Sequence, residues 1–416
     1  MIVRLALASL WARALTVGMT VLAIALSVAL FVGVEKVRTG AKASFADTIS
    51  GTDLIVGARS GSVQLLLYSV FRIGNATNNV TWQSYRDIAT RPEVDWIVPI
   101  SLGDSHRQFR VMGTTTAFFD HYKYRNKRSL ALADGAVMAD LFDAVIGADV
   151  ASTLGYSVGD PIVVAHGIAS FSTHDDQPFR VSGVLEKTGT PVDRTVIVSL
   201  EAIEAIHVDW QGGAKRPGAA TPVEQIRQMD LTPKAITAAL VGVKSPLQTF
   251  GLQRAINNYD EEPLLAILPG VALQELWGIV GLAETALLAV SAMVVVTALI
   301  GMMATVFSSL NERRREMAIF RAMGASPVTV FALLILEAVF MAAFGALFGL
   351  GLLYVGLVIA QPVLDSALGL WLPIEPPSWR EAWILLGVVV AGAIVSLVPA
   401  FRAYRMSLSD GMMVRT

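Results

Sequence analysis

Residues 311–331 read Asn-Glu-Arg-Arg-Arg-Glu-Met-Ala-Ile-Phe-Arg-Ala-Met-Gly-Ala-Ser-Pro-Val-Thr-Val-Phe and separate two long apolar segments. Asn311 can cap a short helix, and Glu312 suits the positive end of that helix dipole. Gly324 suits the left-handed position that ends a helix, and Ser326-Pro327 supplies a cap and a first-turn proline for the next helix. An arginine-rich stretch of this kind is typical of a cytoplasmic loop. The sequence therefore predicts a short cytoplasmic helix over 311–327 that joins two membrane spans.

Four apolar segments surround this loop or precede it. The first, Leu15–Val34, ends the N-terminal segment 1–34, and the other three cover about 277–310, 328–360 and 383–401. About 20 apolar residues cross the hydrocarbon core of a bilayer, so each segment is long enough. A secretory signal peptide is the alternative for the first segment, but its apolar core is shorter, about 7–15 residues. The chain is 54% hydrophobic and only 16% charged, which also favours a membrane protein.

Charges in the loops predict the orientation of the spans, because cytoplasmic loops carry an excess of Lys and Arg. The loop 311–327 and the tail 402–416 are rich in arginine and are expected inside, whereas the loop 361–382 is acidic and is expected outside. Residues 35–276 then lie outside. Three basic residues just after the first span oppose this arrangement: Lys36, Arg38 and Lys42. A long translocated domain tolerates such charges.

Residues 35–276 are numerous enough to bury a core of their own. Strand patterns include Thr195–Ser199 and Leu240–Val243, and Trp82–Ala89 has a helical pattern. The residues directly after the first span predict a helical stalk. We therefore predict an α-helical membrane protein with four transmembrane helices and a mixed α/β extracytoplasmic domain inserted between helices 1 and 2. That domain is expected either as one unit or as two subdomains.

The stretch 311–331 resembles a motif of the MacB/FtsX-like ABC transporter permeases, a family that includes LolC/LolE- and DevC-like membrane subunits. The resemblance continues through Gly345, Gly349 and Gly351 and through Pro399–Ala403, and Asp53–Gly57 is similar as well. It covers the C-terminal third closely and the first 60 residues loosely. It implies that the chain is the permease subunit of such a transporter.

The resemblance implies that a separate ABC ATPase subunit acts on the cytoplasmic helix. The residues expected to couple the two chains are Glu312, Arg313, Arg314, Arg315, Glu316, Arg321 and Gly324. No Gly-x-x-x-x-Gly-Lys-Ser/Thr phosphate loop occurs in the sequence, so ATP and Mg are expected on the partner and no cofactor on this chain. The chain is then a non-catalytic subunit, in a homodimer or in a dimer with a related permease.

In such an assembly, ATP-driven motion would pass to the periplasmic domain and export or extract a substrate from the periplasm or inner membrane. The expected location is the bacterial inner membrane, with both termini cytoplasmic. Further expected partners are a periplasmic adaptor or lipoprotein and membrane lipid. A net charge of −2 gives no reason to expect nucleic acid. The alternative function is that of an FtsX-like regulator of a periplasmic cell-wall hydrolase, without transported cargo.

Two carboxylates and two glycines stand out within the apolar segments. Ionisable groups in a span are functional candidates, so Glu337 has either a functional role or a headgroup contact, and for Glu284 the headgroup contact is favoured. Gly345 and Gly349 form a Gly-x-x-x-Gly pattern, which permits close packing of helices. We predict that Glu337, Gly345 and Gly349 serve membrane packing or function.

Two features of the outer segment have an ordinary and a functional interpretation. The apolar residues Leu65, Leu66, Leu67 and Phe71 predict a core helix, and the alternative is an apolar surface for a lipid-like cargo. All five histidines lie in this segment, with His174 next to Asp175 and Asp176. Together with His166, these three residues could form a metal site, but the spacing of the histidines matches no metal-binding signature, so we favour solvated loops and predict no metal site. No catalytic motif occurs, and we predict no catalytic residue.

Overall fold

The computed structural model describes residues 2–125, 127–167, 174, 177–211, 214–216, 221–312, 319, 321–368, 374 and 376–405. The chain divides into two compact units. The membrane unit comprises Met1–Gly40, Gly281–Pro362 and Leu372–Thr416, and the inserted domain comprises Ala41–Val280 and Val363–Trp371.

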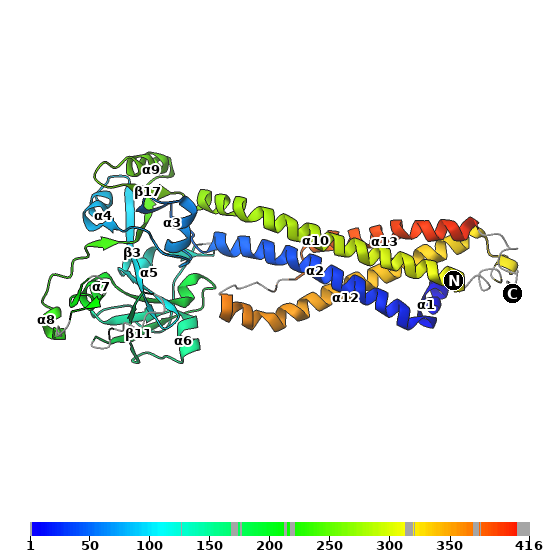
Figure 1. Ribbon diagram of the computed structural model, residues 1–416, viewed down its shortest axis with the longest axis horizontal. Helices are drawn as coiled ribbons and strands as arrows, with labels where there is room; N and C mark the ends of the chain where they lie inside the picture. Colours follow the sequence, from blue (N-terminus) through cyan, green and yellow to red (C-terminus); the bar gives the residue numbers. More distant parts are fainter. Residues whose placement is uncertain are drawn as a thin grey trace. The chain divides into compact units, whose positions relative to one another are not determined.

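Long apolar helices build the membrane unit (Figure 1). The helices are α1 (Ile2–Ala12), α2 (Ala14–Asp47), α10 (Pro269–Glu312), α12 (Pro327–Leu368) and α13 (Trp379–Arg405). Among the described residues, the last four are long and apolar enough to cross a membrane. Both α2 and α10 continue without a break past the boundary between the units. The predicted fold class, four transmembrane helices with a mixed α/β domain inserted between the first two, is confirmed.

The central helix of the membrane unit is α12. In the most apolar 18-residue stretch of α12, 50% is buried, whereas the corresponding share in the other three spans is 17–33%. Small and medium side chains four residues apart line its buried face: Leu334, Ala338, Ala342 and Ala346. Residues at this spacing share one helix face, so α12 presents a continuous surface of mostly small side chains to its neighbours. Helices in a bilayer associate through close packing of this kind.

A sheet of 11 strands runs through the inserted domain in the order β17-β1-β16-β3-β4-β12-β8-β11-β7, with β10 beside β3 and β9 beside β11. The strands are β1 (Leu54–Ala58), β3 (Val94–His106), β4 (Phe109–Thr114), β7 (Leu132–Gly135), β8 (Asp143–Ile146), β9 (Pro161–Ile162), β10 (Ala165–His166), β11 (Phe179–Leu185), β12 (Thr195–Ser199), β16 (Ala238–Val243) and β17 (Leu264–Ile267). Short pairs join β2 (Val80–Thr81) to β15 (Ala235–Ile236), β5 (Lys123–Tyr124) to β6 (Arg128–Ser129), and β13 (Trp210–Gln211) to β14 (Ala214–Lys215).

Short helices connect these strands. They are α3 (Ser62–Ser69), α4 (Trp82–Ala89), α5 (Ala117–His121), α6 (Ala148–Leu154), α7 (Leu200–Ile206), α8 (Val223–Ile226) and α9 (Thr249–Asn257), with 3₁₀ turns η1 (Pro191–Arg194) and η2 (Pro246–Gln248). Side-chain caps fix where two of them begin: the hydroxyl of Thr81 accepts a bond from the Ser84 amide, and that of Ser199 from the Ala202 amide. Each cap satisfies an amide that the first turn would leave unpaired.

The sheet is mixed. Strands β4 and β12 are parallel, as are β8 and β11, while the other pairs are antiparallel. The longest strand, β3, has 13 residues, and its pairing with β4 shifts register between Leu102 and Ser105. The irregularity turns the end of β3 toward β10, where Asp104 stands opposite His166. This end of β3 places several polar side chains together.

Candidate functional site

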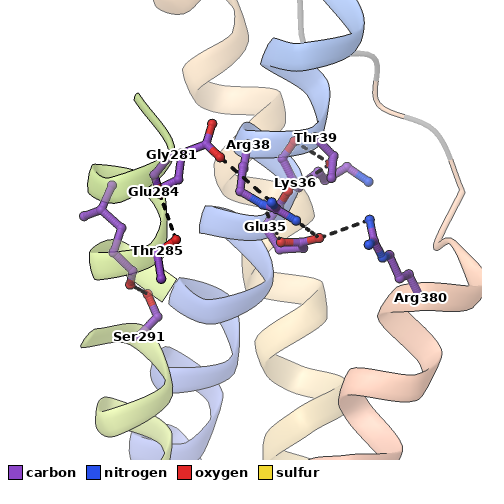
Figure 2. Close-up of polar contacts among 10 residues, drawn as sticks. Glu35, Lys36, Arg38, Thr39, Gly281, Glu284, Thr285, Ser291 and Arg380 are labelled. Atoms are coloured by element: carbon purple, nitrogen blue, oxygen red, sulfur yellow. Dashed lines mark hydrogen bonds and ion pairs between the residues drawn. The ribbon is translucent and has the colours of Figure 1, made fainter. Parts of the chain in front are cut away.

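Three charged residues near the end of the apolar run of α2 contact the other spans, and Figure 2 shows the contacts of two of them, Glu35 and Arg38. Arg38 donates two hydrogen bonds to Glu35, of 2.9 and 3.0 Å. Glu35 also lies 3.3 Å from Arg380 of α13, and Arg38 lies 3.9 Å from Glu284 of α10. Glu284, for which the sequence favoured a headgroup contact, thus faces a cation of the same chain.

Lys36 extends this set of contacts to α12. Its ammonium donates bonds of 3.0 Å to the hydroxyl of Tyr354 and 3.0 Å to the carboxylate of Glu381. The Tyr354 hydroxyl in turn donates to Glu381, at 3.2 Å. We call the whole set the ionic belt, and its members are Glu35, Lys36, Arg38, Glu284, Tyr354, Arg380 and Glu381. The belt ties all four spans together at one level of the membrane unit.

The belt is electrically balanced, with three cations and three carboxylates. The side chains of Lys36 and Glu381 are only 14% and 8% exposed, so each charge needs its partner. Lys36 and Arg38, two of the three basic residues whose position opposed the predicted orientation, are thus paired with carboxylates of the membrane unit.

Glu337 is the second buried carboxylate of the membrane unit. It lies in α12, is 1% exposed, and accepts a 3.1 Å bond from Arg13, which precedes α2. A side chain this buried does not reach lipid headgroups, which was one of the two interpretations of Glu337. The contact joins the start of α2 to α12 and has the pairing that ionisable groups in a membrane usually require.

Replacing Glu337 with Leu is expected to lower the free energy of unfolding by about 2 kcal/mol, the scale of a lost hydrogen bond to a charged group. The loss is limited because Arg13 is 20% exposed and its long side chain can extend toward water. Unfolding of the purified protein in mixed micelles measures the change. Glu337→Gln keeps an acceptor and should lose less, and an equal loss in both variants would contradict the assignment.

Gly345 and Gly349 lie where α12 approaches α2. A Cβ on Gly345 would come within 2.6 Å of Ile24, and one on Gly349 within 2.4 Å of the carbonyl oxygen of Ala25. Both glycines therefore face a helix of the same chain. Gly351, two residues further on, has no atom within 4 Å of its added Cβ.

The predicted coupling residues are placed only in part. Arg313, Arg314, Arg315 and Glu316 lie outside the described residues. Glu312 is the last residue of α10, and Arg321 belongs to the short helical turn before Gly324. Gly324 has φ +96°, as predicted for a helix-ending glycine, and the Ser326 hydroxyl accepts a bond from the Thr329 amide at the start of α12.

The alternative of an apolar cargo surface over Leu65–Phe71 is wrong. Leu65 and Leu66 are 0% exposed and Phe71 is 7% exposed, because α3 packs them into the core under the sheet, and Leu67 packs against that same core. Phe71 does line one wall of a cavity of about 430 Å³ in the inserted domain, together with Arg72, Arg110 and Arg194. Burial lowers the pKa of the Arg72 guanidinium to about 10.

Sequence reasoning singled out only Glu284 of the belt as a candidate and missed the other six members: Glu35, Lys36, Arg38, Tyr354, Arg380 and Glu381. The sequence did contain a signal for these residues, because charged or hydroxyl side chains recur near that end of each apolar segment which is expected to face the outside. One sequence cannot assign the pairs, because Lys36 and Glu381 are 345 residues apart.

Two family models match the chain. The MacB-like periplasmic core domain matches residues 17–244, and the FtsX-like permease C-terminal domain matches residues 288–408. An uncharacterised ABC transporter permease of Methanocaldococcus jannaschii is 22% identical over 229 residues, which cover 54% of this chain and 51% of that protein. The chain thus spans about half the length of the curated relative it matches.

Two solved structures are similar to the inserted domain at low scores. The periplasmic region of MacB from Actinobacillus actinomycetemcomitans is 10% identical with a TM-score of 0.35, and the match covers 55% of this chain and 94% of that one. The extracellular domain of the ABC-type transporter YknZ from Gram-positive bacteria is 14% identical with a TM-score of 0.30, covering 52% and 99%.

The family models carry the assignment. The first alone covers more than half of the chain, from within α2 to the end of β16, and the second covers the last three spans. The periplasmic-domain model precedes the permease model along the chain, as the inserted domain precedes the last three spans. The chain therefore belongs to the MacB/FtsX-like family of ABC transporter permeases.

Proposed function

We propose that the chain is a membrane subunit that receives motion from an ATPase on a separate chain and passes it to the inserted domain. The motion would enter at the loop between α10 and α12, which includes the coupling residues, and leave through α2 and α10. The expected result is export or extraction of a substrate from the periplasm or the inner membrane. The chain would lie in the bacterial inner membrane with both termini cytoplasmic, in a dimer of permease subunits.

The ionic belt is the observation that supports this proposal best. Helices that transmit motion have to move together. Lys36 joins α2 to α13 through a buried ion pair of 3.0 Å and to α12 through a hydrogen bond, and Arg38 lies 3.9 Å from Glu284 of α10. Both α2 and α10 then continue as unbroken helices into the inserted domain. In the proposed mechanism, these two helices pass the displacement of the bundle to that domain.

Purification from native membranes under mild detergent tests the proposal. We expect an ABC ATPase to accompany the wild-type chain in equal amount and to be lost from Arg314→Glu or Glu316→Arg, because each substitution reverses a charge in the coupling segment. Arg86→Glu, on the exposed side of α4, is the matched control and should retain the ATPase.

Two other results would change the proposal. The absence of any ATPase from the wild-type preparation, and failure to reconstitute one, would contradict coupling to a separate chain. A cell-wall hydrolase purified together with the ATPase would favour the regulatory alternative over transport.

A further inference from the structure

Three of the five histidines meet one carboxylate in the inserted domain. Asp104, His166, His174 and His207 each direct one ligand atom to a common point, and these atoms all lie within 4.8 Å of one another. They come from β3, from β10, from the connection between β10 and β11, and from the C-terminal end of α7. The nearest two along the chain are eight residues apart, so the fold and not a local motif assembles the group.

The separations between the ligand atoms suit a single metal ion. His166 Nδ1 lies 3.0 Å from His207 Nε2 and 3.3 Å from Asp104 Oδ1, and His207 Nε2 lies 3.8 Å from that oxygen. A tetrahedral zinc ion with bonds of 2.0–2.1 Å keeps its ligand atoms about 3.3 Å apart. The three measured distances scatter around this value.

A hydrogen bond to the backbone holds one of the ligands, His207, in a state ready to bind. Nδ1 of His207 lies 2.7 Å from the carbonyl oxygen of Ile203, to which only a protonated nitrogen can donate. In the neutral ring Nε2 therefore keeps its lone pair, and this nitrogen faces the group. A backbone carbonyl that fixes the tautomer of a ligating histidine is a recurring feature of metal sites.

Asp104 supplies the negative charge. It is 3% exposed, and no donor among the described residues makes a hydrogen bond to its Oδ1. Strand pairing sets Asp104 directly opposite His166, whose Nδ1 lies 3.3 Å from Oδ1. A buried carboxylate oxygen surrounded by imidazole nitrogens is an environment that attracts a cation.

The aromatic ring of Trp210 covers one side of the group. The Trp210 ring is tilted against both imidazoles, with its centroid 4.3 Å from that of His174 and 5.7 Å from that of His166, and His174 is 1% exposed. An apolar cover of this kind limits access of water and strengthens metal–ligand attraction.

The other two histidines show what a structural histidine looks like in this domain. His106 is buried and lies 2.6 Å from the carbonyl oxygen of Val163 and 3.2 Å from the hydroxyl of Tyr156. His121 stacks on Trp96 at 4.7 Å. Neither belongs to the group of four ligands.

We propose that Asp104, His166, His174 and His207 form a site for one divalent transition-metal ion, and that Zn²⁺ fits it best. Three imidazole nitrogens and one carboxylate oxygen are ligands of borderline softness, and four of them complete a tetrahedral shell. A complete shell leaves no position for a substrate, so the ion fastens the connection at His174 to β3 and α7. The prediction of no metal site came from sequence spacing alone. Asp175 and Asp176, the carboxylates of the alternative metal site with His166 and His174, lie outside the described residues.

Zinc content of the full-length protein in detergent, prepared without a histidine tag, tests this site. After stripping with a chelator and dialysis against zinc, we expect about one zinc ion per chain, as for a single closed site. Cobalt should give the visible absorption of a tetrahedral complex in the same preparation. Zinc should also raise the midpoint of thermal unfolding in proportion to the logarithm of its concentration.

Three variants make the test specific. His166→Ala removes a ligand whose side chain is 40% exposed, so the fold should tolerate it, and Asp104→Asn removes the charge at constant shape. Each should weaken zinc binding by more than the roughly 10–100-fold typical of outer partners of a metal site. His121→Ala should bind like the wild type. Absence of zinc from the wild-type protein, or equal zinc in the wild type and His166→Ala, would overturn the proposal.

Discussion

Gly349→Leu is expected to prevent the membrane unit from packing, so that little folded protein reaches the membrane. Even the first carbon of a side chain would lie 2.4 Å from the carbonyl oxygen of Ala25 and 3.0 Å from the Cα of that residue. These are backbone atoms of α2, which cannot rotate away as a side chain can. Relief would require α2 and α12 to separate, and the buried faces of both helices would then lose contact. Overpacking typically costs about 1–3 kcal/mol when side chains can adjust, and here they cannot.

A graded series measures this effect against a control from the same helix. Gly349→Ala should already lower the unfolding midpoint in micelles, and Gly349→Leu should reduce the folded yield much further. Gly351→Ala should be neutral or slightly stabilising, because its Cβ meets no atom within 4 Å and glycine weakens a helix interior by about 0.5–1 kcal/mol. Equal behaviour of the two alanine variants would show that the helices do not pack at Gly349.

The parts of the fold that depend on local rules were predictable. Helix α4 has the predicted limits because the cap at Thr81 and the amphipathic spacing both lie within nine residues. Strand β12 likewise has the predicted limits. The positive φ of Gly324 was predictable because few residue types other than glycine adopt this backbone conformation.

The parts that depend on contacts between distant segments were not predictable. The apolar spacing of Leu65 and Leu66 is the same for a core helix and for an exposed apolar face, and only the sheet above them decides between the two. The partner of Lys36 follows from the order of the helices in the bundle. His166 meets Asp104 because β10 pairs with β3 in one register, and a shift by one residue would turn the two side chains to opposite faces.

Lys36→Met is expected to destabilise the membrane unit by about 3–5 kcal/mol, the usual effect of removing one partner of a buried ion pair. Glu381 would keep its negative charge at 8% exposure, with the Tyr354 hydroxyl as a neutral donor. Unfolding in mixed micelles measures the loss. Lys42→Met, six residues further along α2, is the control. Its ammonium lies 5.3 Å from the Trp277 ring at a half-buried position, a contact worth about 0.5–2 kcal/mol.

The double variant Lys36→Met/Glu381→Leu separates the stability of the belt from its proposed role. Apolar residues of similar volume often replace a buried ion pair with no loss of stability or a gain of about 1–4 kcal/mol, so this variant should unfold like the wild type. It lacks the bonds that Lys36 makes to α12 and α13, although Glu35 still contacts Arg380 of α13. If the Lys36 contacts transmit motion, the variant should retain the proposed ATPase, and the complex should turn over ATP without moving substrate. Full transport by this stable variant would show that the Lys36 contacts serve packing and are not needed for coupling.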